Sequence, residues 1–298
     1  MGESMGWAEG CIAVDWGTTN RRAYLLDGDG RCASEFEDDR GILAVKDGAF
    51  PDAVQQIRDR LGDRPLLLGG MIGSNRGWVE APYAFCPAGL DDLAGALVRT
   101  GDRCAIVPGV AFTGDGRADV MRGEEIQLVG AAAAGLVPPD CIVCHPGTHN
   151  KWARMEGGRI ASFRTVMTGE LFNLLRQHSI LASLLDGDVE PGEAFAAGVR
   201  TGLADSGITA ELFSLRARCL LGRGNPQDTA AFASGLLIGE DIRVGMRGAG
   251  GGELIVMGRP ELTELYVAAL AEAGYSAREV DGETAFIAGI RRIAERIE

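Results

Sequence analysis

Two segments far apart in the chain share one form, a short apolar run that breaks into a Gly-Thr turn. Residues 11–20 read CIAVDWGTTN and residues 141–150 read CIVCHPGTHN. Their β-branched residues favour strands, and glycine beside hydroxyl and amide side chains favours a turn. Strand and helix signals alternate after each turn, over most of the length. This repetition predicts an α/β protein with an internal duplication, whose two halves enclose a cleft.

The boundary between the halves is expected in the Ala/Gly-rich stretch before Pro138 and Pro139, because proline cannot continue a helix. We therefore predict an N-terminal domain over residues 1–135 and a C-terminal domain over residues 136–298. Apolar spacing also predicts helices at 91–101 and 284–297.

Composition narrows the class of protein. The 298 residues are 46% hydrophobic, which excludes a disordered chain, and the formal charge is −13. An acidic surface repels nucleic acid and anionic membrane, so we expect neither as a partner. No apolar run reaches the length that spans a bilayer, and the N-terminus does not resemble a signal peptide. These features predict a cytoplasmic protein.

The cysteines agree with this location. An odd number, seven, indicates reduced thiols rather than a disulfide framework. The CIVCH of residues 141–145 matches a haem-attachment pattern, but its apolar middle favours a buried strand that matches by coincidence.

The first turn carries the groups that a phosphate chain and its metal ion require. Asp15 ends the apolar run, where a carboxylate can hold Mg²⁺ together with water and phosphate. Gly17 allows close approach of the backbone to an anion. The donors Thr18, Thr19 and Asn20 suit phosphate oxygens. Arg21 and Arg22 follow in a strand, so they point to opposite faces, and we favour Arg22 for the cleft.

The second turn repeats the pattern. Gly147 and Thr148 follow an apolar run, and His149, Asn150 and Lys151 add donors. Two such turns can hold a triphosphate from both sides. A further glycine turn at Gly258 follows a strand and can pass close to the ribose and base of a nucleotide. The chain contains no G-x-x-x-x-G-K-[ST] motif, which excludes a P-loop enzyme.

The segment MRGEEIQLVGA places two carboxylates, Glu124 and Glu125, at the start of a predicted helix. Either could orient a substrate hydroxyl and accept its proton, and Glu124 is favoured. Arg122 sets a cation beside them and, like Arg22, is a candidate to bind the substrate. Which of Arg21, Arg22, Arg76 and Arg122 would hold a substrate carboxylate stays open.

A glycine-rich patch at 69–78 combines a hydroxyl, an amide, a guanidinium and an indole. This set suits a small polyhydroxylated anion. The side chains are those of Ser74, Asn75, Arg76 and Trp78.

With these residues in place, the whole chain resembles the 2-dehydro-3-deoxygalactonokinases, sugar-acid kinases of the actin/hexokinase/Hsp70 superfamily. The segments that carry the resemblance are VDWGTTNRRAYLL, GGMIGSNRGWVEAPY, VMRGEEIQLVGA, PGTHNKW, FRTVMTGEL and GETAFIAGIR. The resemblance implies two ribonuclease-H-like (actin-like ATPase) domains with ATP and Mg²⁺ in the cleft. It also implies phosphorylation of 2-dehydro-3-deoxy-D-galactonate at its 6-hydroxyl, in galactonate catabolism.

The resemblance assigns roles to matching positions. Residues 15–20 correspond to the first phosphate motif, Gly147 and Thr148 to the second, and Gly258 to the adenosine motif. GEEIQLVG aligns with a G-D-x-x-x-x-L-V-G helix start, which puts Glu124 at the position of the catalytic base, with glutamate in place of the usual aspartate.

Three alternatives stay open at this point. One is a phosphohydrolase of the same superfamily, the second is a kinase for the gluconate-derived epimer, and the third is a non-catalytic ATP-binding protein. The sequence leaves the oligomeric state open, with a homodimer as one option.

Overall fold

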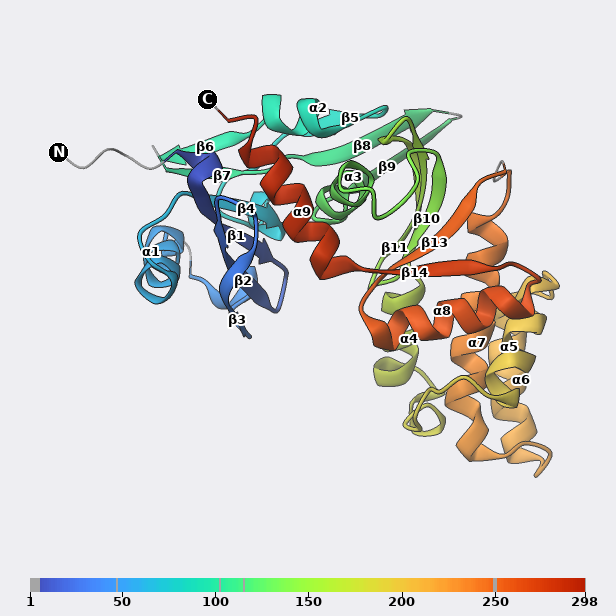
Figure 1. Ribbon diagram of the computed structural model, residues 1–298. Coiled ribbons are helices and arrows are strands. Elements are labelled where there is room, and N and C mark those ends of the chain that lie inside the picture. The colour runs from blue at the N-terminus through green and yellow to red at the C-terminus, as the bar shows by residue number, and fades with distance from the viewer. Residues whose placement is uncertain (1–5, 47, 102, 115, 249–250, 298) are drawn as a thin grey trace. The chain divides into compact units, whose positions relative to one another are not determined.

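The computed structural model describes residues 6–46, 48–101, 103–114, 116–248 and 251–297. The chain forms two compact α/β units (Figure 1). Unit 1 comprises Met1–Pro139, Met155–Ser162 and Gly282–Glu298, and unit 2 comprises Asp140–Arg154 and Phe163–Asp281. The predicted duplicated α/β architecture is confirmed.

The main sheet of unit 1 has six strands in the order β3-β2-β1-β4-β7-β6. β1 pairs antiparallel with β2 and parallel with β4, which pairs parallel with β7. The strands are β1 Gly10–Trp16, β2 Arg21–Asp27, β3 Cys32–Asp38, β4 Leu66–Gly70, β6 Val98–Gly101 and β7 Cys104–Ile106. β1 and β4 are buried almost throughout, as their apolar sequences require.

Helices lie on both faces of this sheet (Figure 1). The helices of unit 1 are α1 Phe50–Leu61, α2 Leu90–Gly95, α3 Glu124–Ala133 and α9 Gly282–Ala294. Short 3₁₀ turns occur at Trp7–Glu9, Ile42–Ala44 and Met71–Gly73, and a small sheet joins β5 Tyr83–Phe85, β8 Gly109–Gly114 and β9 Arg117–Met121. α1 buries Ala53, Val54, Ile57 and Leu61 against the core, at the helical spacing of one face. Each of the larger side chains contributes about 1.5–3 kcal/mol by burial.

The last helix belongs to unit 1, whereas the sequence placed it in a domain over residues 136–298. α9 packs against α3 at two glycines, Gly130 and Gly289. A β-carbon on Gly130 would overlap the backbone at Ala285 and Gly289, so the two helices approach within backbone contact. The hydrophobic pattern within each segment could not reveal that α9 packs in unit 1, because this contact joins residues far apart in sequence. The units divide after Pro139, rather than after residue 135.

A five-stranded sheet, most of which lies in unit 2, has the order β12-β11-β10-β13-β14 and so repeats the order of the first five strands of the unit 1 sheet. The hairpin end at Met155–Ser162, between β11 and β12, is assigned to unit 1. β13 pairs parallel with both β10 and β14. These strands are β10 Cys141–His145, β11 Asn150–Glu156, β12 Arg159–Val166, β13 Glu253–Gly258 and β14 Ala277–Asp281. The helices are α4 Thr168–His178, α5 Glu193–Leu203, α6 Ile208–Leu220, α7 Thr229–Gly245 and α8 Pro260–Glu272, with 3₁₀ turns at Ala182–Leu184 and Pro226–Asp228. The core lies between β10, β13 and the helices α5, α7 and α8.

The expected helix at 91–101 is only half formed. α2 ends at Gly95, and Val98–Gly101 forms the edge strand β6, antiparallel to β7. Backbone pairing with a buried neighbouring strand outweighs the helical spacing of these residues.

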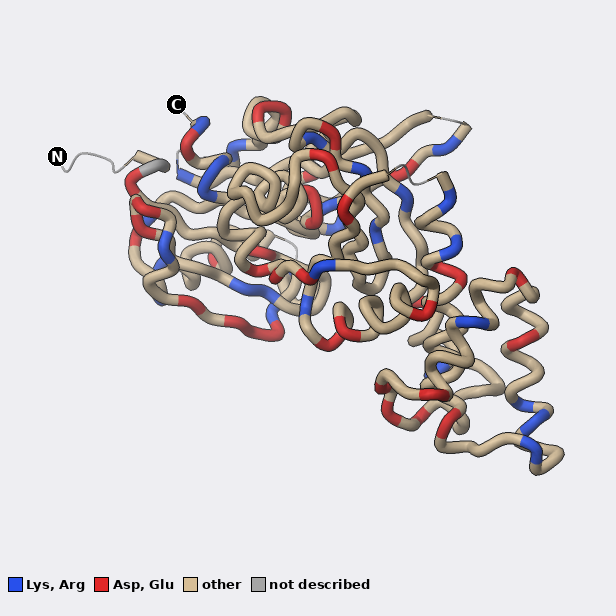
Figure 2. Tube along the Cα trace, turned by 45° about the vertical axis from the view of Figure 1, so that its right-hand side comes forward, with Lys and Arg blue, Asp and Glu red and all other residues tan. Residues whose placement is uncertain are grey.

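Other features agree with the composition. The structure holds the seven cysteines as free thiols, and Cys141 and Cys144 lie buried in β10, so the CIVCH match is a strand. Acidic residues occur throughout both units, interspersed with lysine and arginine (Figure 2). Over the described ranges, no helix has both the length and the apolar character to cross a bilayer.

Candidate active site

The first Gly-Thr turn is held rigidly by the segment that follows β3. The amide of Gly17 donates to the carbonyl of Asn20 at 2.9 Å and closes the turn. The amides of Gly41, Ile42 and Leu43 donate to the carbonyls of Thr19, Gly17 and Thr18 at 2.8, 3.0 and 3.2 Å. With its carbonyls bonded to protein, the turn leaves Thr18, Thr19 and Asn20 exposed.

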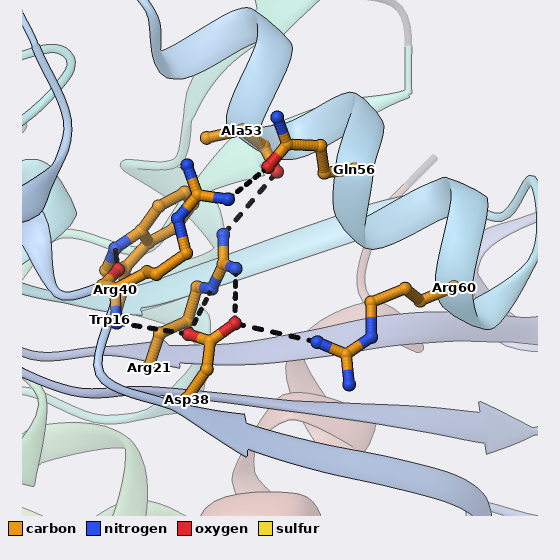
Figure 3. A network of polar contacts seen from close by, with 7 residues as sticks. All are labelled: Trp16, Arg21, Asp38, Arg40, Ala53, Gln56 and Arg60. Carbon is orange, nitrogen blue, oxygen red and sulfur yellow. Dashed lines mark hydrogen bonds and ion pairs between the residues drawn. The ribbon is translucent and has the colours of Figure 1, made fainter.

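Arg21 anchors this turn from within the core (Figure 3). Its guanidinium makes a two-pronged ion pair with Asp38, at 2.7 and 3.2 Å, and donates to the carbonyl of Ala53 in α1 at 3.5 Å. It also lies 4.9 Å from the ring centre of Trp16. Arg21 is 2% exposed, and therefore ties β2, β3 and α1 together instead of facing a ligand.

Arg22 points to the other face of the sheet, as the strand period predicts. Its guanidinium pairs with Glu37 at 3.1 Å and lies 3.9 Å from Glu283 of α9. The Tyr24 hydroxyl donates to the same Glu283 carboxylate at 2.9 Å. Two carboxylates thus balance the charge of Arg22.

Three elements of unit 1 converge at Gly70, the end of β4. A β-carbon on this glycine would lie 3.3 Å from Oδ1 of Asp15 on β1. A β-carbon on Gly123, just before α3, would lie 3.3 Å from the Cα of Gly70. The two glycines have φ of +86° and +112°, which other residues rarely adopt. The structure thereby brings the Asp15 carboxylate close to the start of α3.

The two glutamates at the start of α3 have different surroundings. Glu124 is partly exposed, and its Oε2 accepts the Arg122 amide at 3.1 Å. Glu125 is fully buried, and its Oε2 accepts the Gly123 amide at 2.6 Å. Its Oε1 is buried without a hydrogen-bond partner among the described residues. Burial, and then the neighbouring Glu124 carboxylate, raise the pKa of Glu125 to about 8.

The glycine-rich patch after β4 forms a tight loop with mixed roles for its side chains. The Ser74 hydroxyl donates to the Met71 carbonyl at 2.7 Å and accepts the Arg76 amide at 3.3 Å, so it shapes the loop. Asn75 and Arg76 are exposed. Trp78 stacks on Phe50 of α1, with ring centres 6.4 Å apart, and packs on the core.

Arg122 lies beside this loop. A β-carbon on Gly73 would approach its Nη1 to 2.9 Å. Its Nη2 donates to the Ala81 carbonyl at 2.8 Å, and its guanidinium lies 4.4 Å from the ring centre of Tyr83. Its Nε and Nη1 are buried and have no hydrogen-bond partner within the described chain.

The second turn is fixed within unit 2 by β11 and α4. The Gly147 amide donates to Oδ1 of Asn150 at 2.7 Å. The Thr148 carbonyl accepts the Glu170 amide at 2.9 Å, and the His149 ring pairs with the Glu170 carboxylate. Thr148 is exposed, so its hydroxyl is accessible to a ligand.

Lys151 and Gly258 lie close to this second turn, in different ways. Lys151 is 4% exposed, and its ammonium donates to the His149 carbonyl at 2.8 Å, so it is engaged inside the turn. Gly258 ends β13 beside β10, and a β-carbon on it would lie 3.7 Å from the Pro146 carbonyl oxygen.

The donor set fits a magnesium ion that is held mainly by a nucleotide. Within the part of the chain that the structure describes, no three His, Cys, Asp or Glu side chains gather as a metal site. Magnesium at phosphate sites commonly takes one or two carboxylates and completes its shell with water and phosphate. Asp15 at a strand end next to the first turn suits that role.

Comparison with solved structures agrees with this fold. An activator of 2-hydroxyisocaproyl-CoA dehydratase from Clostridium difficile, with bound ADPNP, has a TM-score of 0.52 and 10% identity, over 96% of this chain and 94% of that chain. At this identity the likeness shows the fold alone. The chain thus shares a two-unit α/β fold with that activator.

Closer similarities identify the family. The family model for 2-keto-3-deoxy-galactonokinase matches residues 15–293. The 2-dehydro-3-deoxygalactonokinase of Escherichia coli (strain K12) is 38% identical over 291 residues, covering 96% of this chain and 98% of the relative. A crystal structure from Sinorhizobium meliloti, provisionally described as a 2-dehydro-3-deoxygalactonokinase, has a TM-score of 0.89 and 35% identity, over 95% of this chain and 98% of that chain. This chain belongs to the 2-keto-3-deoxy-galactonokinase family.

Proposed function

We propose that this protein transfers the γ-phosphoryl group of ATP to the 6-hydroxyl of 2-dehydro-3-deoxy-D-galactonate, in galactonate catabolism. The observation that carries the proposal is the 38% identity to the E. coli enzyme along nearly the full length of both chains. The geometry of unit 1 supports it, because Asp15 and the start of α3 meet at Gly70. The expected cytoplasmic location belongs to the same proposal.

The first turn and Asp15 bind the phosphate end of ATP. Thr18 and Thr19 are exposed on a turn fixed by hydrogen bonds and offer donors to phosphate oxygens, beside Gly17. Asn20 is also exposed, and its Nδ2, which donates to Glu37 at 3.4 Å, has a second hydrogen for a phosphate oxygen. Asp15 would hold Mg²⁺, which when bound offsets the negative charge of the phosphates. The rigidity matters because donors fixed before the reaction pay no reorganisation cost in the transition state.

Unit 2 supplies the second phosphate turn and the nucleoside contact. Gly147 and the exposed Thr148 offer a backbone amide and a hydroxyl. Gly258 has no side chain, so the adenosine can approach its backbone closely. Lys151 acts on the turn from within, since its ammonium is bonded to the His149 carbonyl.

Glu124 acts as the general base. It is partly exposed, whereas Glu125 is fully buried and, with a pKa of about 8, is mostly protonated at neutral pH. The 6-oxygen forms a bond to the γ-phosphorus as the bond from that phosphorus to the β,γ-bridging oxygen breaks. The hydroxyl proton passes to the Glu124 carboxylate, and ADP leaves.

The loop at 71–78 and Arg122 form the sugar-acid site. Arg76 is the best candidate for the substrate carboxylate, because it is exposed, whereas Arg22 is paired with Glu37 and Arg122 donates to Ala81. Asn75 is exposed and suits a substrate hydroxyl. Ser74, Trp78 and Arg122 hold this region in shape and define its walls, whereas Arg22 is engaged by Glu37 and Glu283.

Product analysis tests the proposed reaction. Purified protein is incubated with ATP, Mg²⁺ and 2-dehydro-3-deoxy-D-galactonate, and the products are identified by phosphorus NMR and mass spectrometry. We expect equal amounts of ADP and a sugar acid that carries a phosphate ester at the 6-position. Inorganic phosphate as the only phosphorus product beside ADP would identify a phosphohydrolase instead.

A further inference from the structure

A polar cluster lies in the core of unit 2, on side chains that the reaction above does not use. Its centre is Asp241 of α7, whose side chain is fully buried. Four donors from three other elements surround the carboxylate. They are Asn150 and Trp152 of β11, Thr168 of α4 and Tyr266 of α8.

Each carboxylate oxygen of Asp241 is used. Trp152 Nε1 donates to Oδ1 at 2.8 Å, and Thr168 Oγ1 donates to Oδ2 at 2.8 Å. The Asn150 amide and the Tyr266 hydroxyl also donate to Oδ2. Burial raises the pKa of Asp241 above its ordinary value, while the four hydrogen bonds act in the opposite direction. Removing a carboxylate from water costs free energy, and an apolar side chain would fill the same volume of the core without that cost.

Asn150 connects the cluster to the second phosphate turn. Its Nδ2 donates to Asp241, and its Oδ1 accepts the Gly147 amide at 2.7 Å. A primary amide has one accepting and one donating end, whereas an ionised carboxylate only accepts. Asp241 therefore fixes which end of the Asn150 amide faces Gly147.

A second connection runs through the start of α4. Thr168 is its first residue and donates to Asp241. Two residues later, the Glu170 amide donates to the Thr148 carbonyl at 2.9 Å, and the intervening Gly169 packs directly on Gly147. Both arms of the cluster thus end on the same turn.

On the basis of the proposed function, in which this turn binds phosphate, we propose that Asp241 is a positioning residue for ATP. Through Asn150 it holds the Gly147 amide in the orientation that the nucleotide requires. The role is indirect, because Asp241 is buried and its bonds go to protein side chains.

The substitution Asp241→Asn tests this role with almost no change in volume. The new amide has one accepting oxygen for four donors. Where the new NH₂ group takes the place of Oδ2, the hydroxyls of Thr168 and Tyr266 can rotate to accept from it, but the Asn150 amide must turn over to do so. That rotation presents an NH₂ group to the Gly147 amide, which loses its acceptor. Asn150→Ala removes the same link directly and serves as the second variant.

Trp152→Phe is the matched control. It removes one hydrogen bond to the same carboxylate and leaves the Asn150 link to Gly147 intact. We expect a lower melting temperature for this variant, because Oδ1 of Asp241 loses its partner. Trp152→Phe keeps the link between Asn150 and Gly147, whereas the other two variants are meant to break it. If all three variants lose a similar amount of melting temperature, a difference in ADP binding between them reports positioning and not general stability.

Two readouts are measured on wild-type protein and the three variants, with folding checked by near-UV circular dichroism. The first is hydrogen exchange by mass spectrometry of the peptide that covers residues 146–150, without nucleotide. The second is the dissociation constant of ADP with Mg²⁺, by calorimetry. We expect Asp241→Asn and Asn150→Ala to accelerate exchange in this peptide and to weaken ADP binding about tenfold, with Trp152→Phe within twofold of wild type in both.

The outcomes separate this inference from the proposed function. Exchange and ADP affinity near wild type in folded Asn150→Ala would overturn the positioning role, whatever Asp241→Asn shows. Kinase activity of the wild-type protein would then still support the proposed function. Weakening of ADP binding by Trp152→Phe to the same extent as by the link variants would also overturn it. Wild-type protein that bound no ADP would instead contradict the proposed function. If Asp241→Asn does not fold, Asn150→Ala carries the test.

Discussion

The carboxylate of Asp15 occupies the space beside Gly70, where a β-carbon would lie 3.3 Å from its Oδ1. Gly123 approaches the same glycine from the direction of α3, so the end of β1 and the start of α3 meet with only backbone between them. This arrangement puts a metal-binding type of side chain close to the start of α3, whose first residue is Glu124. The site of a phosphoryl transfer needs these two groups near each other.

Glu124→Gln tests the base. Glutamine keeps the size of the side chain but cannot accept a proton, so we expect turnover to fall about 10²–10⁴-fold. The dissociation constant of ADP should stay within about twofold, because the proposed mechanism gives Glu124 no contact with the phosphates. Steady-state kinetics and calorimetry measure both quantities. Glu193→Gln, at the first position of α5, is the control and should keep full activity. Turnover within a few-fold of wild type would exclude Glu124 as the base.

Arg76→Ala tests the sugar-acid site. Loss of a charged partner for the substrate carboxylate should raise the KM for the sugar acid about ten- to a hundredfold, since such bonds contribute about 1.5–3 kcal/mol. The KM for ATP should change little. Arg31→Ala alters another exposed arginine of unit 1, 80% exposed, and should change neither constant. A sugar-acid KM equal to that of wild type would remove Arg76 from the site.

The local parts of this account are visible in the sequence, and the long-range parts are not. The two strand–turn units were predictable because strand propensity and turn residues act over a few positions, as in residues 11–20 and 141–150. The return of α9 to unit 1 depends on the contact of Gly130 with Gly289. No periodicity within either helix encodes that partner.

The same distinction applies to the charged residues of the site. The strand period correctly separated Arg21 from Arg22, but their partners Asp38 and Glu283 come from other elements. The burial of Asp241 went unpredicted, although a carboxylate in the apolar helix segment GLLIGEDI is a signal of a buried polar partner.

Glu125→Gln should change how stability depends on pH. Burial raises the pKa of Glu125 from 4.5 to about 8, so the native protein keeps this proton over a range in which the unfolded chain has lost it. The contribution of Glu125 to the free energy of unfolding should therefore be largest below about pH 4.5 and should fall as the pH rises toward 8. Glutamine cannot ionise, so the variant should lack this loss, which is on the order of 2–5 kcal/mol.

Chemical unfolding of both proteins at pH 5 and pH 8 measures this difference. The free energy of unfolding of wild type should fall further than that of Glu125→Gln between the two values. Parallel changes in the two proteins would show that Glu125 does not hold a proton in the native state.

Gly130→Ala tests the packing of α9 in unit 1. The added methyl group would overlap backbone atoms of Ala285 and Gly289, so the helices must separate. We expect a loss of about 1–3 kcal/mol in the free energy of unfolding. Gly95→Ala, in α2 with open space around the new β-carbon, is the control and should be neutral or slightly stabilising. Equal stabilities for the two variants would contradict the close crossing of α3 and α9.

The most direct test of the central claim is a coupled assay of ADP release with a small panel of acceptors. Wild-type protein with ATP and Mg²⁺ is given 2-dehydro-3-deoxy-D-galactonate, its gluconate-derived epimer, or no sugar acid. We predict rapid ADP release with the galactonate-derived acid, a lower kcat/KM with the epimer, and release near background without an acceptor. Equal rates of ADP release with and without sugar acid would contradict the claim that this protein is a sugar-acid kinase.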